Sequence, residues 1–94
     1  MTLLTGAQLE RRLQSAGDWH RDEDQSIVRD LSFPDFAAAI AFVNHVAELA
    51  EAANHHPDIL VHGWNKVRLT LSTHSQGGLT DADFQLAGQI DALA

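Results

Sequence analysis

Two adjacent histidines, His55 and His56, stand in the stretch EAANHHPD at residues 51–58. An imidazole can donate or accept a proton near neutral pH because its unperturbed pKa is about 6.5. Pro57 biases His56 toward extended backbone and stops a helix that reaches it, so the two side chains are expected to point in different directions. Glu51 lies one helical turn before His55, where its carboxylate can hydrogen-bond that imidazole. The stretch is therefore a candidate for a site of general acid–base chemistry.

Two other interpretations of the doublet stay open at the level of the residues alone. Histidines at a helix C-terminus favour the negative end of the helix dipole by about 0.3–1 kcal/mol, so the stretch could be a polar helix end and nothing more. A metal site would use Glu51, His55, His56 and His74, but the chain has no HxxxH or HxH pair with which one element could chelate an ion. The remaining histidines are expected at the surface or in supporting positions: His20, His45 and His62.

Three stretches have the residue pattern that begins a helix, a hydroxyl residue followed three positions later by an acidic or amide residue. They predict helices over residues 6–16, 34–54 and 81–93. The pairs are Thr5 with Gln8, Ser32 with Asp35, and Thr80 with Asp83. Pro34 disfavours helical backbone at the residue before it, which can move the start of the second helix along the chain.

The second helix is expected to be the longest and to pack one apolar stripe on the core. Glu51 and two other polar residues fall nearer the solvent side. The stripe is Phe36, Ile40, Val43, Ala47 and Ala50; the other two polar residues are Asn44 and Glu48. In the third helix the corresponding stripe is Phe84, Ala87, Ile90 and Leu93.

Between the helices, apolar and polar residues alternate with a period of two, as in a half-buried strand. The clearest case is residues 66–74, whose polar face would present His74. Further strands are predicted over 59–63, over 27–33, and over 19–21 across an acidic turn at 22–24. The order predicts an α+β fold, α-β-β-α-β-β-α, with a four-stranded antiparallel sheet covered on one face by helices.

The composition limits the classes of protein to consider. A chain of 94 residues is read as a single domain, residues 1–94. Its net charge of −7, with 6 Lys and Arg residues scattered along the chain, argues against nucleic acid as the ligand. The chain has no cysteine, no expected membrane span and no basic-then-apolar leader, so the cytoplasm is the expected compartment. Few aromatic residues are available for the core, which favours a homo-oligomer.

Taken together, the candidate residues form one spaced pattern: Glu51, His55-His56-Pro57, Trp64, His74 and Asp83. This pattern resembles the signature of the pterin-4a-carbinolamine dehydratase family, and the element order resembles that family's fold. The segment between Pro57 and Trp64 departs from vertebrate relatives in having aliphatic residues in place of aromatics and six residues in place of five. Both lengths occur in the family, so the departure bears on the pocket lining and on the preferred substrate side chain.

The resemblance implies a lyase that dehydrates 4a-hydroxytetrahydropterin to quinonoid dihydropterin and water, without metal or organic cofactor. By position, the active-site histidines fall on His55, His56 and His74. We expect His56 and His74 to act as acid and base and His55 to bind and orient the pterin, with Glu51 orienting His55.

Three further residues of the pattern support the site or the fold. Pro57 is expected to direct the doublet. Trp64 either lines the pterin pocket or belongs to the core, and Asp83 is the third residue of a capping box, which favours a structural role.

The resemblance also implies partners and a rival function. It suggests a homodimer or homotetramer and a functional link to an aromatic amino acid hydroxylase in tetrahydropterin recycling. The rival is a non-catalytic pterin-binding or protein-assembly module on the same scaffold.

Overall fold

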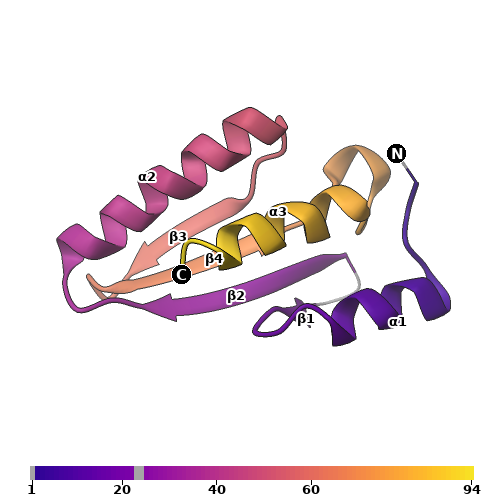
Figure 1. Ribbon diagram of the computed structural model, residues 1–94, viewed down its shortest axis with the longest axis horizontal. Helices are drawn as coiled ribbons and strands as arrows, with labels where there is room; N and C mark the ends of the chain where they lie inside the picture. Colours follow the sequence, from indigo (N-terminus) through magenta and orange to yellow (C-terminus); the bar gives the residue numbers. More distant parts are fainter. Residues whose placement is uncertain (1, 23–24) are drawn as a thin grey trace.

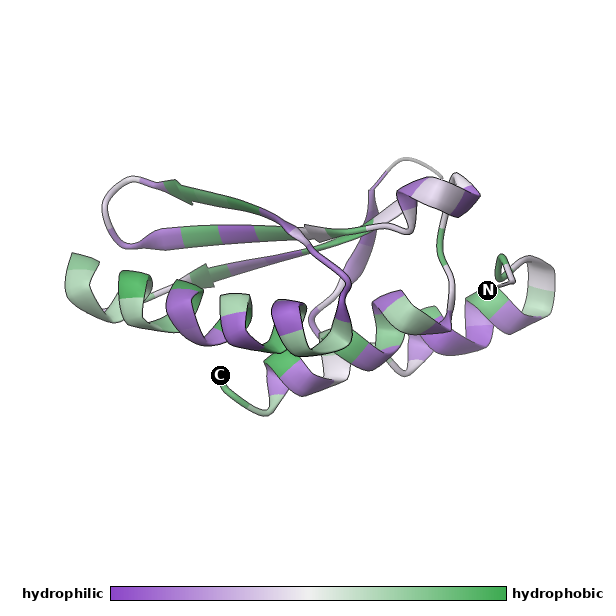
Figure 2. Cartoon of the chain, turned by 90° about the horizontal axis from the view of Figure 1, so that it is seen from above, coloured by the Kyte–Doolittle hydropathy of each residue, from purple (hydrophilic) through white to green (hydrophobic). Residues whose placement is uncertain are grey.

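The computed structural model describes residues 2–22 and 25–94. Within these residues the elements are α1 (Gly6–Gln14), β1 (His20–Asp22), β2 (Ser26–Ser32), α2 (Phe36–Ala53), β3 (Asp58–His62), β4 (Lys66–Leu71), the 3-10 helix η1 (His74–Gln76) and α3 (Asp81–Asp91). The strands form one antiparallel sheet, and the α-helices lie in a single layer against one face of it (Figures 1 and 2). The predicted α+β fold is confirmed. The predicted acidic turn includes Glu23 and Asp24, which lie outside the described residues.

The sheet has the strand order β1-β2-β4-β3, so β2 and β4 are central. The apolar residues of β4, Val67, Leu69 and Leu71, are 0% exposed and face the helices. The polar residues between them lie on the open face, and the alternation is visible as green and purple bands along this strand in Figure 2. The period of two therefore predicts β4 correctly as far as Leu71.

On the open face of the sheet, Arg68 of β4 pairs with Asp30 of β2. The guanidinium donates to both carboxylate oxygens, with Nε–Oδ1 at 2.8 Å and Nη2–Oδ2 at 3.0 Å. This hydrogen bonding by Arg68 lowers the pKa of Asp30 below its ordinary value, against a small opposing effect of burial. Both side chains are about half exposed, so solvent screens the pair.

The three predicted helix starts have different outcomes. At α3 the capping box is confirmed, with the Thr80 N–H donating to Asp83 Oδ2 at 2.9 Å. At α2 the cap is Asp35, which accepts from the Ala38 N–H at 2.7 Å. Ser32 was the wrong residue because Pro34 keeps the preceding backbone extended. Thr5 does precede α1, but its side chain makes no capping hydrogen bond, so the predicted box there is wrong.

The face of α2 that packs on the core coincides with the predicted stripe only at Ala50 and at the partly buried Val43. The buried residues are Ala39, Phe42, Val46 and Ala50, whereas Phe36 is 54% exposed. The helix is apolar around most of its circumference, so its periodicity does not single out one face. Similarly, Leu93 is 41% exposed, because α3 ends at Asp91 before reaching it.

By length and composition alone, α2 is long and apolar enough to cross a membrane. One such helix is weak support for a span, since a core helix passes the same test. Here 22% of the helix is buried, and its buried face packs against α3 and β4.

Candidate active site

The backbone at the end of α2 positions the histidine doublet. Asn54 adopts a left-handed conformation, with φ of 50° and ψ of 42°, immediately after the last helical residue. The His55 N–H then donates to the Ala50 carbonyl at 3.1 Å, and the Asn54 N–H donates to the Glu51 carbonyl at 3.3 Å. This is the hydrogen-bond pattern of a Schellman cap, which asparagine tolerates better than most residues. The chain therefore reverses at Asn54, before Pro57 is reached.

His55 is hydrogen-bonded to a buried carboxylate. Its Nε2 lies 2.6 Å from Asp83 Oδ1, and the Asp83 side chain is 0% exposed while that of His55 is 14% exposed. The other oxygen of Asp83, Oδ2, accepts from Thr73 Oγ1 at 2.8 Å and from the Thr80 N–H at 2.9 Å. Asp83 thus caps α3 and also orients His55. The capping role expected from the sequence is therefore only one of its two roles.

His56 has a carboxylate partner of its own. Its Nε2 lies 2.5 Å from Glu51 Oε2, with side chains 55% and 77% exposed. The expected pairing of Glu51 with His55 is therefore wrong. The left-handed turn at Asn54 carries His55 toward α3 and leaves His56 to reach back over the last turn of α2.

Both pairings leave the same ring nitrogen available. Carboxylates only accept hydrogen bonds, so each Nε2 carries the proton that its carboxylate accepts. The Nδ1 of His55 and the Nδ1 of His56 are then the atoms that can take or return a proton. The two histidines differ in environment, since His55 is mostly buried and His56 is exposed.

Two threonines support Asp83, and neither was a candidate from the sequence. Thr73 and Thr80 are 5% and 0% exposed, and their hydroxyl oxygens lie 2.8 Å apart. Because Thr73 donates to Asp83, the hydroxyl of Thr80 is the donor to Thr73. The available signal was a polar residue at position 73, where the buried odd-numbered positions of β4 continue beyond its end at Leu71.

The prediction that His74 projects from a strand is wrong. The strand ends at Leu71, and Thr73 forms an isolated bridge with Gly78 around the turn η1, which His74 begins. The imidazole is exposed. Since Thr73 is bonded to Asp83, and Asp83 to His55, the structure brings His74 to the same end of the sheet as the doublet (Figure 1).

Trp64 lies elsewhere. It occupies the β3–β4 turn with φ of 57° and is 61% exposed, so its assignment to the core is wrong. The turn is at the opposite end of β3 from Pro57, and five strand residues span about 16 Å. Within one chain, Trp64 is therefore not brought together with the histidines.

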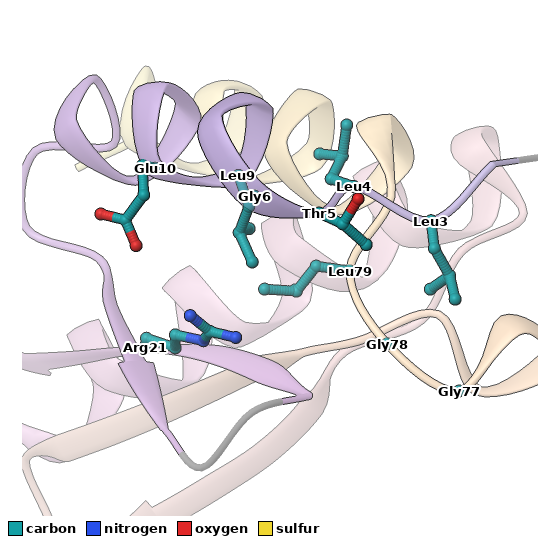
Figure 3. A pocket seen from close by; sticks show the side chains of 10 residues that line it. All are labelled: Leu3, Leu4, Thr5, Gly6, Leu9, Glu10, Arg21, Gly77, Gly78 and Leu79. Atoms are coloured by element: carbon teal, nitrogen blue, oxygen red, sulfur yellow. The ribbon is translucent and has the colours of Figure 1, made fainter.

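No three histidine, cysteine or carboxylate side chains among residues 2–22 and 25–94 are grouped so that they could hold a metal ion. A cavity of about 340 Å³ lies between α1, β1 and the loop after η1. Figure 3 shows the side chains of Leu9, Leu79 and Arg21 directed into the space between α1 and β1. None of the residues of the spaced pattern lines this cavity.

The fold and this site define a class: a small α+β domain that presents histidines with carboxylate partners at one end of an antiparallel sheet. Comparison with known proteins agrees. The sequence profile of the family described as "Pterin 4 alpha carbinolamine dehydratase" matches residues 2–93. The chain belongs to this family.

Individual relatives cover nearly the whole chain. The chain is 52% identical over 93 residues to a protein of Acidobacterium capsulatum, covering 99% of each, and 48% identical over 93 residues to one of Chloroflexus aggregans, covering 99% of the chain and 98% of the relative. Both carry the name "Putative pterin-4-alpha-carbinolamine dehydratase".

Two solved structures are also similar. The crystal structure of a "transcriptional coactivator/pterin dehydratase" from Brucella melitensis has a TM-score of 0.91 and 33% identity, with 99% of each chain covered. A pterin dehydratase-like protein identified as a RuBisCO assembly factor in the alpha-carboxysome has a TM-score of 0.69 and 28% identity, with 82% of this chain and 89% of that chain covered.

Proposed function

We propose that this protein catalyses the dehydration of 4a-hydroxytetrahydropterin to quinonoid dihydropterin and water, using histidines as acid and base and no metal or organic cofactor. The observation that carries the proposal is the pair of adjacent imidazoles, each held through Nε2 by its own carboxylate, so that the Nδ1 of His56 is left for proton transfer and the Nδ1 of His55 for a hydrogen bond to the pterin. Membership of the family supplies the substrate class.

The reaction needs two proton transfers at neighbouring positions of the pterin. The C4a–O bond breaks as the departing hydroxyl is protonated, and the electron pair comes from N5, whose proton passes to a base. The products are water and quinonoid dihydropterin, so atoms and charge balance. Each well-placed proton transfer is worth about 10²–10⁴ in rate.

We assign the acid and base roles to His56 and His74, both of which are exposed. Glu51 positions His56 through the bond to Nε2. His55, fixed by Asp83 and mostly buried, binds and orients the pterin. Pro57 biases the backbone of His56 toward an extended conformation just before β3 begins.

The experiment generates the 4a-carbinolamine with an aromatic amino acid hydroxylase and follows its decay by absorbance. The protein is expected to accelerate this decay, and His56→Ala and His74→Ala are each expected to lower kcat by at least about 10²-fold. His45→Ala is the matched control, since His45 is an exposed histidine on α2 outside the site. Normal turnover in both site variants would overturn the assignment.

A non-catalytic assembly or dimerisation module is the second candidate. It is favoured by the names of the two similar structures, one a coactivator and the other an assembly factor. Bound pterin with no acceleration of carbinolamine decay would support this candidate over the enzyme. The enzyme proposal includes a homodimer or homotetramer, measurable by light scattering, and a role beside a hydroxylase in cytoplasmic tetrahydropterin recycling, measurable by tetrahydropterin levels after deletion.

A further inference from the structure

The cavity between α1, β1 and the loop after η1 is not used by the proposed reaction. Its volume of about 340 Å³ falls at the lower end of the range for small-molecule sites, about 300–1,000 Å³. Its lining combines apolar side chains with two opposite charges: four leucines, Leu3, Leu4, Leu9 and Leu79, together with Glu10 and Arg21. The cavity is therefore suited to one small molecule that has both apolar and charged groups.

The start of the chain forms one wall of the cavity, because it is held on the loop after η1. The Leu4 N–H donates to the Leu79 carbonyl at 2.8 Å. A Cβ atom at Gly78 would lie 3.0 Å from Leu3 Cδ2, so the glycine lets Leu3 lie close against the loop. Leu79 and Leu9 belong to the hydrophobic core, whereas Leu3 is 39% exposed. An apolar group bound in the cavity would therefore remove part of Leu3 from water.

Two side chains of opposite charge border this apolar wall. Arg21 of β1 is paired with Ile27 of β2, which is 0% exposed, so the arginine projects from the face of the sheet that the helices cover. Figure 3 shows its guanidinium directed into the space between α1 and β1, and the Glu10 carboxylate directed from α1 toward β1. Because the two charges are opposite, the cavity favours neither a net anion nor a net cation.

A molecule that matches this lining carries a carboxylate, an ammonium group and an apolar side chain. A guanidinium binds a carboxylate through two parallel N–H···O bonds, and its five N–H donors allow further partners at the same time. The carboxylate of Glu10 accepts hydrogen bonds from an ammonium group. The leucines favour an apolar side chain, because its burial removes apolar surface from water.

We propose that this cavity binds a free α-amino acid with an apolar side chain. The carboxylate of the amino acid lies on Arg21, its ammonium group on Glu10, and its side chain against Leu3 and Leu79. The binding does not rest on the proposed dehydration, because none of the residues of the spaced pattern lines the cavity.

The cavity and the histidine site share a loop. The Thr73 N–H donates to the Gly78 carbonyl at 2.8 Å, and the Thr73 hydroxyl donates to Asp83, the partner of His55. A ligand that binds only while this loop is in place stabilises the loop by mass action. The bound amino acid is therefore expected to slow hydrogen exchange at the Thr80 amide, which donates to Asp83. An exchange rate at Thr80 that the ligand leaves unchanged would refute this coupling.

The glycines of the chain provide the binding test, because three of the six line the cavity and three do not. Protein labelled with ¹⁵N-glycine is titrated with L-leucine at millimolar concentrations and followed by NMR. Saturable shifts are expected at the amides that line the cavity, with the others unchanged. The lining glycines are Gly6, Gly77 and Gly78, and the internal controls are Gly17, Gly63 and Gly88. No shift, or equal shifts at all six amides, would overturn the proposal.

Two analogues with the side chain of leucine test the two charged groups of the ligand separately. Isocaproate lacks the ammonium group, and L-leucinamide lacks the carboxylate. Each is expected to bind about tenfold more weakly than L-leucine, because it leaves one charged side chain of the cavity without its partner. Equal binding of isocaproate would refute the contact with Glu10. Equal binding of L-leucinamide would refute the contact with Arg21 and would indicate a site for a peptide N-terminus instead.

Substitutions at the two exposed charged positions complete the test. Glu10→Gln is expected to weaken L-leucine about tenfold without weakening isocaproate, and Arg21→Gln to weaken L-leucine without weakening L-leucinamide. Glu48→Gln is the matched control, since Glu48 is exposed on α2 and does not line the cavity. Unchanged binding of L-leucine by both cavity variants would overturn the proposal. If wild-type protein does not accelerate carbinolamine decay, the proposed function fails, yet the glycine shifts still decide whether the cavity binds the amino acid.

Discussion

Replacing Asp83 with asparagine separates its two roles. The asparagine amide keeps only one oxygen. That oxygen must take the position of Asp83 Oδ2, because Thr73 and the Thr80 N–H both donate to this atom. The NH₂ group is then left facing His55 Nε2, which it can satisfy only if that nitrogen becomes an acceptor. His55 would move its proton to Nδ1, the atom that under the proposed function hydrogen-bonds the pterin.

The expected loss of activity and stability in Asp83→Asn follows from the hydrogen bond between His55 and Asp83 that the substitution changes. The Nε2–Oδ1 contact is 2.6 Å long and fully buried on the Asp83 side, and a hydrogen bond to a charged group contributes about 1.5–3 kcal/mol. Loss of about 2 kcal/mol in binding the transition state corresponds to a roughly 30-fold fall in kcat/KM. Unfolding should be easier by a similar free energy, a fall of roughly 10 °C in Tm for a domain of this size.

The assay measures carbinolamine decay by stopped-flow absorbance and the tautomer of His55 by ¹⁵N NMR. Asp81→Asn is the control, because Asp81 lies in the same first turn of α3 but is 65% exposed and pairs with Arg12. Asp83→Asn with kcat/KM within about threefold of wild type, and with His55 still protonated at Nε2, would refute the reasoning.

Three further predictions concern neighbouring features. Glu51→Gln should lower kcat about tenfold or more without changing Tm, because it replaces the charged acceptor of the exposed His56 with a neutral amide, and steady-state kinetics with thermal melts will check this. Asn54→Ala should cost about 1 kcal/mol in urea unfolding because alanine resists the left-handed conformation, whereas Asn54→Gly should be neutral or stabilising; equal effects would contradict the cap. Arg68 lowers the pKa of Asp30 in the folded protein, so the ion pair stabilises the fold at pH values above the pKa that the Asp30 carboxyl has in the unfolded chain. This stabilisation is lost as the pH falls through the lower pKa of the folded protein. Asp30→Asn should therefore weaken the fold slightly at pH 7 and not at pH 2, measured by urea unfolding; a difference that persists in acid would exclude the ion pair.

The parts of the fold that were predictable depend on local pattern. Two predictions that involve only residues close in sequence were confirmed. They are the capping box of Thr80 with Asp83 and the alternation of buried residues in β4, Val67, Leu69 and Leu71. The buried face of α2 was not predictable, because an almost uniformly apolar helix is oriented by the sheet it packs on.

The site was predictable in its residue types and not in its pairings. Which carboxylate serves His55 depends on one left-handed residue, Asn54, and on Asp83 arriving from a distant helix. Glu51 is nearer in sequence but is used by His56. Spacing along one helix cannot anticipate a contact that tertiary packing decides.

Because Asp83 both begins α3 and orients His55, opening of that helix end and misalignment of the imidazole are one event. The Thr80 amide, which donates to Asp83 Oδ2, is protected from hydrogen exchange only while the carboxylate is in place. Its exchange rate therefore reports how often the site is disassembled, and any binding partner that loosens the first turn of α3 would lower activity without touching a histidine.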